Sequence, residues 1–145
     1  MKLIDLNLFL YATNRDSPHH LRAKEWVEEL LSGEETVAIP WVVILGFIRV
    51  STHPRILPRP LTSKQAVAVV DSWLARPQVL LLNPADEHWG ILSGLLAETG
   101  TAGHLTTDAH LAALAIEHDA ELCSTDTDFA RFRQLRWTNP IAGLA

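Results

Sequence analysis

The sequence predicts an α/β domain in which parallel strands are covered by helices on both faces. Short apolar segments with strand character alternate with pairs of helical segments in a recurring β-α-α order, which is typical of parallel sheets. The chain has 145 residues and is 48% apolar, so it is long enough for one buried core and too short for two comfortable domains. We therefore expect residues 1–145 to form a single domain.

The first half of the sequence contains two strand segments, each followed by two helical segments. We expect a strand at residues 2–4, helices at 7–12 and 19–31, a strand at 36–39, and helices at 41–50 and 63–74. Pro40 suits the start of a helix, and Thr62 is a good N-cap for the helix that follows it. The proline-rich residues 53–60 form a loop within the domain.

The second half continues the same alternation. We expect a strand at residues 78–82, a helix at 84–98 and a flexible connection at 99–103. The next helix is capped by Thr106 or Thr107 and runs to about His118. It is followed by a strand at 121–124, a short helix after Asp126, and an edge strand at 134–137. Because the strands are expected to be parallel, their carboxyl ends meet at one edge of the sheet, where open α/β folds build their sites.

Composition limits the classes of function. The single cysteine, Cys123, excludes a disulfide within the chain and indicates a reducing compartment. No apolar stretch approaches a membrane span, and Asp5 and Asn7 interrupt any signal-peptide pattern, so we expect a cytoplasmic protein without a membrane association. The net charge of −5 counts against binding of nucleic acid. Divalent ions at a carboxylate cluster would soften that objection.

Four aspartates occupy positions that suggest a shared site. Asp5 follows the first strand, Asp126 and Asp128 follow the strand at residues 121–124, and Asp108 lies in the first turn of a helix. Several carboxylates together favour a hard metal ion such as Mg²⁺. Each also has a structural interpretation, because Asp108 would interact favourably with the helix dipole and the Asp126 segment would form an Asx turn.

Other polar residues have two interpretations each. Asn7 either hydrogen-bonds a carboxylate or caps the first helix, and Ser124 supplies a hydroxyl that would orient the acids. Arg49 either contacts phosphate or forms a salt bridge. His104 and His110 flank Asp108 but lack a further ligand at zinc-like spacing, so we do not expect them to bind metal.

Several segments, in this order and spacing, resemble the PIN-domain nucleases, and more closely the VapC toxins of bacterial VapBC toxin–antitoxin pairs. The resemblance covers nearly the whole chain and is far more specific than any single acid. The segments that carry it are residues 4–12 (IDLNLFLYA), 46–50 (GFIRV), 104–113 (HLTTDAHLAA), 120–132 (AELCSTDTDFARF) and 135–137 (LRW).

This resemblance implies a three-layer α/β/α fold with a mainly parallel central sheet. It also implies an endoribonuclease that depends on Mg²⁺ or Mn²⁺, stops translation by cutting RNA, is restrained by a VapB antitoxin, and forms a homodimer or a hetero-oligomer with that antitoxin. Asp5, Asp108 and Asp126 fall on the acidic, metal-binding positions of the family, and Asp128 adjoins them as a fourth catalytic acid. Asn7, Ser124 and Arg49 would support them.

The sequence departs from the family at one acidic position. Most PIN domains carry a glutamate on the helix that here reads Ile44-Leu45-Gly46-Phe47. Either Asp128 or water would complete the metal shell, or the site would bind metal more weakly. The missing glutamate also allows a catalytically degenerate, PIN-like binding module.

A phosphatase is the alternative from another enzyme class. Asp126-Thr127-Asp128 after a strand resembles the D-x-D motif of haloacid dehalogenase-like phosphatases, whose first aspartate is a nucleophile. That motif normally opens its fold, whereas only 17 of the 145 residues follow Asp128 here.

Overall fold

The computed structural model describes residues 1–143 and contains a five-stranded parallel sheet in the order β3-β2-β1-β4-β5. The strands are β1 (Lys2–Ile4), β2 (Val37–Pro40), β3 (Val79–Leu82), β4 (Glu121–Cys123) and β5 (Trp137–Thr138). In the centre, Lys2 of β1 lies opposite Val37 on one side and Glu121 on the other. The predicted parallel sheet is confirmed.

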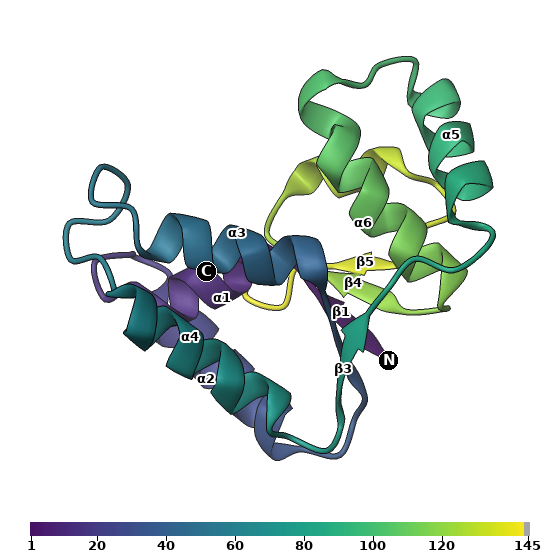
Figure 1. The fold of residues 1–145 in the computed structure, drawn as a ribbon. Coiled ribbons are helices and arrows are strands. Elements are labelled where there is room, and N and C mark those ends of the chain that lie inside the picture. Colours follow the sequence, from purple (N-terminus) through teal and green to yellow (C-terminus); the bar gives the residue numbers. More distant parts are fainter. Residues whose placement is uncertain (144–145) are drawn as a thin grey trace.

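Six α-helices surround this sheet, as the alternating pattern predicted. They are α1 (Leu6–Thr13), α2 (His20–Ser32), α3 (Trp41–Ser51), α4 (Ser63–Leu74), α5 (His88–Thr99) and α6 (Thr106–Glu117), together with the 3₁₀ helices η1 (Gly103–Leu105) and η2 (Thr127–Arg131). Figure 1 shows α1 to α4 gathered as one group and α5 and α6 as another, with the strands between them. The fold is therefore the expected three-layer α/β/α arrangement.

Helix boundaries agree with the sequence where a local capping signal exists. Thr62 and Gln65 form a reciprocal capping box, which starts α4 at the predicted residue. Helix α5 instead begins at His88, four residues later than predicted, because the segment before it forms a turn in which His88 N–H bonds Ala85 O. Helix α6 follows directly on η1, and neither Thr106 nor Thr107 caps it; Leu105 occupies the N-cap position without a side-chain bond.

An aromatic cluster forms the core on the α1–α4 side. The Trp73 ring stacks on Phe9 with centroids 4.0 Å apart and meets the edge of Phe47 at 4.7 Å. The helices α1 and α3 pack closely beside it, since a Cβ added to Gly46 would lie 2.8 Å from Leu6 Cδ2. Leu6 follows Asp5, so this close approach lies next to the first predicted acid. Among the described helices, none is both long and apolar enough to cross a membrane.

Candidate metal centre

The carboxyl edge of the sheet brings the predicted acids together. Strands β1 and β4 are neighbours, with Ile4 opposite Cys123, so the residues that follow them, Asp5 and Ser124, lie side by side. Ser124 Oγ donates a 2.7 Å hydrogen bond to Asp5 Oδ2. The turn after Ser124 then carries Asp126 and Asp128.

Asp5 is held rigidly at this edge. Its side chain is the N-cap of α1, because Oδ1 accepts a 2.7 Å bond from Leu6 N–H, and the residue is only 8% exposed. The pKa of Asp5 is raised, and burial is the largest cause. The hydrogen bonds from Ser124 and Leu6 lower the pKa, whereas the negative charge of Asp126 raises it further. The buried carboxylate is thus kept ordered while its negative charge is only partly offset.

Asn7 and Ser124 form a bracket between α1 and the β4 turn. Asn7 Nδ2 donates to Ser124 Oγ at 3.0 Å and to Asp5 Oδ2 at 3.3 Å, and its Oδ1 accepts from Thr125 N–H at 3.4 Å. Ser124 Oγ also accepts from Asp126 N–H at 3.0 Å. Asn7 therefore contacts a carboxylate, and its alternative role as the helix cap is wrong, because Asp5 is the cap.

Three further carboxylates form a cluster at this edge of the sheet. Asp108, Asp126 and Asp128 each offer an oxygen atom, and these oxygens lie within 4.8 Å of one another. Asp126 Oδ1 also accepts a 2.9 Å bond from Asp128 N–H, so the Asx turn predicted for this segment exists and itself aims both carboxylates at the cluster. The Arg131 Nε atom lies 3.5 Å from Asp128 Oδ1.

The electrostatics of this cluster indicate a surplus of negative charge. The pKa of Asp108 rises from 3.8 to about 6, first because of burial and then because of Asp126, Asp5 and Asp128, while His104 opposes the shift. Mg²⁺ binds oxygen ligands in an octahedron at about 2.1 Å, so its ligand oxygens lie about 3 to 4.2 Å apart. The three carboxylate oxygens, all within 4.8 Å of one another, are hard ligands close to that range. The donor set therefore fits a divalent cation.

The predicted ligand set and the observed cluster differ in one member. Asp5, Asp108 and Asp126 were expected as ligands, whereas the group within 4.8 Å contains Asp128 in place of Asp5. Both oxygens of Asp5 already accept hydrogen bonds. Asp5 nevertheless lies near enough for its charge to raise the pKa of Asp108.

A family model identifies this architecture. The model of the PIN domain matches residues 2–135. The chain belongs to the PIN-domain family. It is 44% identical to ribonuclease VapC37 of Mycobacterium tuberculosis (strain ATCC 25618 / H37Rv) over 142 residues, which covers 98% of this chain and 99% of the relative. It is 45% identical over 141 residues to ribonuclease VapC33 of the same strain, covering 97% and 99%. The predicted resemblance to VapC toxins is confirmed.

Solved structures share the fold of this PIN domain. VapBC2 from Rickettsia felis, bound to a DNA fragment from its promoter, matches with a TM-score of 0.69 at 20% identity, over 95% of this chain and 97% of that chain. FitAB bound to an IR36 DNA fragment matches with a TM-score of 0.67 at 17% identity, over 100% of this chain and 99% of that chain.

The region of the missing glutamate packs partly against α1 in this PIN domain. Ile44 and Phe47 are buried in the core, and any side chain at Gly46 must displace Leu6. Leu45 is 62% exposed. A side chain at position 46 would therefore require the end of the Leu6 side chain to shift, and the third carboxylate of the cluster is supplied by Asp128.

Arg49 lies in the last turn of α3 and is exposed. Within residues 1–143 it makes no salt bridge, so the predicted ion pair is absent from the described structure.

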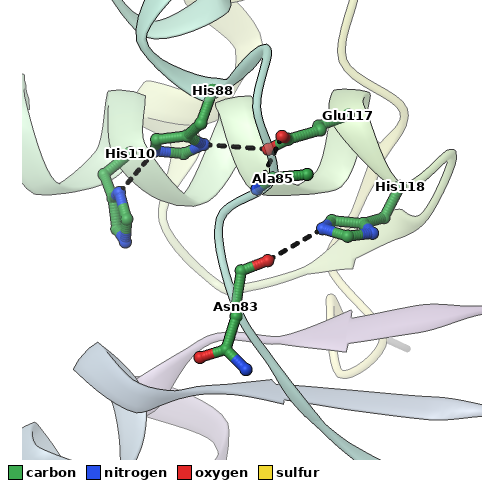
Figure 2. A network of polar contacts seen from close by, with 6 residues as sticks. All are labelled: Asn83, Ala85, His88, His110, Glu117 and His118. Atoms are coloured by element: carbon green, nitrogen blue, oxygen red, sulfur yellow. Dashed lines mark hydrogen bonds and ion pairs between the residues drawn. The ribbon is translucent and has the colours of Figure 1, made fainter.

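A polar network supports α6, the helix that carries Asp108 (Figure 2). His110 was considered from the sequence, whereas His88 and Glu117 were missed. Glu117 Oε1 accepts a 2.8 Å bond from Ala85 N–H, and Glu117 Oε2 lies 3.1 Å from His88 Nδ1. His88 Nε2 lies 2.9 Å from His110 Nδ1. Burial and the nearby His88 lower the pKa of His110, while Glu117 opposes this. His88 and Glu117 are 29 positions apart, so no local pattern could have paired them.

Proposed function

We propose that this PIN domain is a metal-dependent endoribonuclease toxin, inhibited by a VapB-type antitoxin. The observation that carries the proposal is the convergence of Asp108, Asp126 and Asp128 at the carboxyl edge of the sheet. It is supported by 44–45% identity, over nearly the whole chain, to proteins named ribonuclease VapC37 and VapC33.

We assign Mg²⁺, with Mn²⁺ as a substitute, to the three-aspartate cluster. A bound ion would stabilise charge on the scissile phosphate and make a water molecule more acidic. Asp108, Asp126 and Asp128 would hold the ion, since Mg²⁺ needs only a few direct carboxylates. Asp5 would add its negative charge next to the cluster, and it would hold the Asp126 turn in place through Ser124.

Protonation of Asp108 links this site to pH. Because the pKa of Asp108 is about 6, the carboxylate is mostly ionised at neutral pH and mostly neutral below pH 5. Only the ionised form attracts a divalent cation strongly. We therefore assign the activity to neutral pH and expect it to fall on acidification.

The partner follows from the same family. Solved relatives of this fold include VapBC-1 from nontypeable Haemophilus influenzae, which matches with a TM-score of 0.67. A hollow between α1, α2 and α4 has a volume of about 260 Å³ and a mixed lining, with apolar side chains such as Phe9, Val27 and Trp73 beside the charged Lys24, Glu28 and Arg76. We assign this hollow to an apolar segment of the antitoxin.

The phosphatase alternative is not favoured. The D-x-D segment follows β4 rather than the first strand, and the PIN model spans nearly the entire chain. A degenerate binding module would have no need for three converging carboxylates.

Cleavage of total RNA by the purified protein in Mg²⁺, Mn²⁺ or EDTA tests the proposal. We expect discrete fragments that require metal and disappear in Asp108→Asn and Asp126→Asn. The control Asp71→Asn changes an exposed aspartate on α4 and should cleave normally. Intact RNA in every condition, from folded protein without antitoxin, would overturn the proposed activity.

Metal binding is measured separately by the melting temperature. A ligand at a hundred times its Kd stabilises the native state by about 2.7 kcal/mol. Mn²⁺ should therefore raise the Tm of the wild type and of Asp71→Asn, and raise that of Asp126→Asn much less. Equal shifts in all three proteins would place the ion elsewhere.

A further inference from the structure

The charges of this chain are segregated along its sequence. Residues 36–70 contain four of the 12 lysines and arginines and none of the 17 aspartates and glutamates. The rest of the chain therefore carries all of the negative charge. The four cations are Arg49, Arg55, Arg59 and Lys64. They lie on α3, on α4 and on the loop between them, which we call the basic hairpin (residues 49–64).

The basic hairpin is connected directly to the carboxylate edge of the sheet. Helix α3 starts where β2 ends, and its Gly46 packs against Leu6, the neighbour of Asp5. Arg49 follows Gly46 by about one turn. Figure 1 shows α3 leading away from the sheet to the loop, at the far left, that joins it to α4. With 11 residues, α3 spans about 16 Å and carries Arg49 in its last turn. The other three cations follow on the loop and on α4, so the series extends outward from the site.

Three of the four cations lack an anionic partner among residues 1–143. Arg49, Arg55 and Lys64 are exposed and form no salt bridge there. Only Arg59 is paired, through bonds of 2.9 and 3.3 Å to the two carboxylate oxygens of Asp16. Unpaired cations grouped in a protein of net charge −5 are the electrostatic footprint expected for a polyanion.

The loop is ordered by its own contacts. Ile56 and Leu57 N–H both bond His53 O at 3.1 Å, and Leu61 N–H bonds Ser51 O at 2.8 Å. The Leu57 side chain is buried, and His53 Nδ1 accepts from Arg55 N–H. The Arg59–Asp16 pair then fastens the loop to the α1–α2 connection. The cations are consequently presented on a fixed surface, which reduces the entropy cost of binding.

A fifth cation adjoins this surface. Arg15, in the α1–α2 connection, is exposed and lines a hollow of about 330 Å³ together with Leu57, Arg59 and Gln65. Like Arg49, it makes no salt bridge within the described part of the chain. The basic surface thus extends beyond the hairpin.

We propose that the basic hairpin binds the phosphate backbone of the RNA substrate and guides the strand to the three-aspartate cluster. This inference rests on the proposed ribonuclease function and names the surface that holds its substrate. The contacts are to phosphates, so the hairpin supplies affinity and register to RNA of any sequence. It also reconciles an acidic protein with a polyanionic substrate, because residues 36–70 contribute cations and no acidic side chain.

Binding without cleavage tests the hairpin. A labelled single-stranded RNA of random sequence is titrated in EDTA into protein that carries Asp108→Asn, over a range of salt concentrations. The test variant adds Arg49→Gln, Arg55→Gln and Lys64→Gln. The control adds Lys24→Gln and Arg76→Gln, which remove cations outside the hairpin. Circular dichroism and thermal melting verify that all proteins are folded.

We expect the three hairpin substitutions to weaken binding at low salt by at least tenfold. Loss of three phosphate contacts on a single strand should also reduce the slope of log affinity against log salt by about two. The control should retain both values. Unchanged affinity and slope in the test variant would overturn the inference. A preference of the hairpin for duplex DNA over the RNA would overturn it as well.

The outcome is separable from the proposed function. If protein with Asp108 intact cleaves RNA in the presence of metal, and the hairpin substitutions leave RNA binding unchanged, only the proposed role of the hairpin is refuted. Absence of cleavage by that protein in Mg²⁺ and Mn²⁺ would refute the ribonuclease itself. If the hairpin substitutions released a bound antitoxin and left RNA binding unchanged, the surface would be a protein interface and the inference would be wrong.

Discussion

The Ser124 hydroxyl joins the first acid of the site to the turn that carries two others. It donates to Asp5 and accepts from Asn7 Nδ2 and Asp126 N–H, which uses its single proton and both lone pairs. The residue is fully buried, so none of these partners can turn to water without rearrangement. Ser124 Oγ therefore contributes both to the stability of the fold and to the position of the turn that carries Asp126 and Asp128.

Ser124→Ala should destabilise the protein by about 2 kcal/mol, because it leaves a buried carboxylate and an amide short of a hydrogen bond. It should also lower RNA cleavage, since the Asp126 turn loses its anchor. Urea denaturation and cleavage rates measure the two effects. The control is Ser72→Ala on α4, which removes an exposed hydroxyl bonded only to Val69 O. Equal stability of both variants would contradict the role of Ser124.

Asp108→Asn should stabilise the metal-free protein at neutral pH. The folded-state pKa of about 6 exceeds the ordinary 3.8, so the native state holds the proton more tightly and its stability falls as pH rises between these values. The shift corresponds to at most about 3 kcal/mol. Since the group is only half-buried and solvent screens it, we expect a gain of about 1 kcal/mol at pH 7.

This gain should be nearly absent at pH 3.5, where the carboxyl is neutral in the folded state and mostly neutral in the unfolded state. Urea denaturation in EDTA at the two pH values measures it. A variant that is less stable than the wild type at pH 7 would show that Asp108 serves the fold rather than the site.

At the scale of elements, α5 and α6 depend on contacts that are distant in sequence. The start of α4 could be predicted because Thr62 and Gln65 form a local capping signal. The start of α5 could not, because a turn bonded to Glu117 precedes it. The start of α6 was predicted to within two residues, but its cap was not, because η1 leads directly into the helix. Sequence periodicity indicates which face of a helix is buried, but it carries no information on hydrogen bonds between residues that are far apart in the sequence.

Glu117→Ala should loosen α5 selectively. It leaves Ala85 N–H and His88 Nδ1 without their acceptor, at a cost of about 2 kcal/mol, and thereby frees the start of α5. Hydrogen exchange measured by mass spectrometry should show faster exchange in α5 and unchanged exchange in α4. Glu98→Ala, an exposed glutamate on α5, is the control. Uniform acceleration across all helices would indicate a global effect instead.

For the whole molecule, the sequence predicted the strand and helix order and the neighbourhood of the four acids. Apolar strands that end in acids indicate a common sheet edge, because parallel strands align their carboxyl ends. The sequence could not predict which three carboxylates come closest. The outcome depends on two interactions. The Asp5 side chain bonds Leu6 N–H at the start of α1, and the Asx turn at Asp126 places Asp128 close to Asp108. The Asx turn itself was predicted, but its approach to Asp108 joins residues about 20 positions apart, which local spacing does not encode.

Asp5→Asn distinguishes a functional charge from a structural cap, and growth of expressing cells is the readout. The asparagine oxygen can still accept from Leu6 N–H, but its amide nitrogen then meets the Ser124 hydroxyl and Asn7 Nδ2, which both donate to Asp5 Oδ2. The variant should therefore lose some stability and still fold, because burial already disfavours the charge of Asp5. The carboxylate that faces Asp108 and Asp126 is lost, so metal affinity should fall. We expect induction of the wild type and of Asp71→Asn to arrest growth, and induction of Asp5→Asn to leave growth normal at equal soluble protein levels. Arrest by a fully folded Asp5→Asn variant would reduce Asp5 to a helix cap and leave the chemistry to the three-aspartate cluster alone.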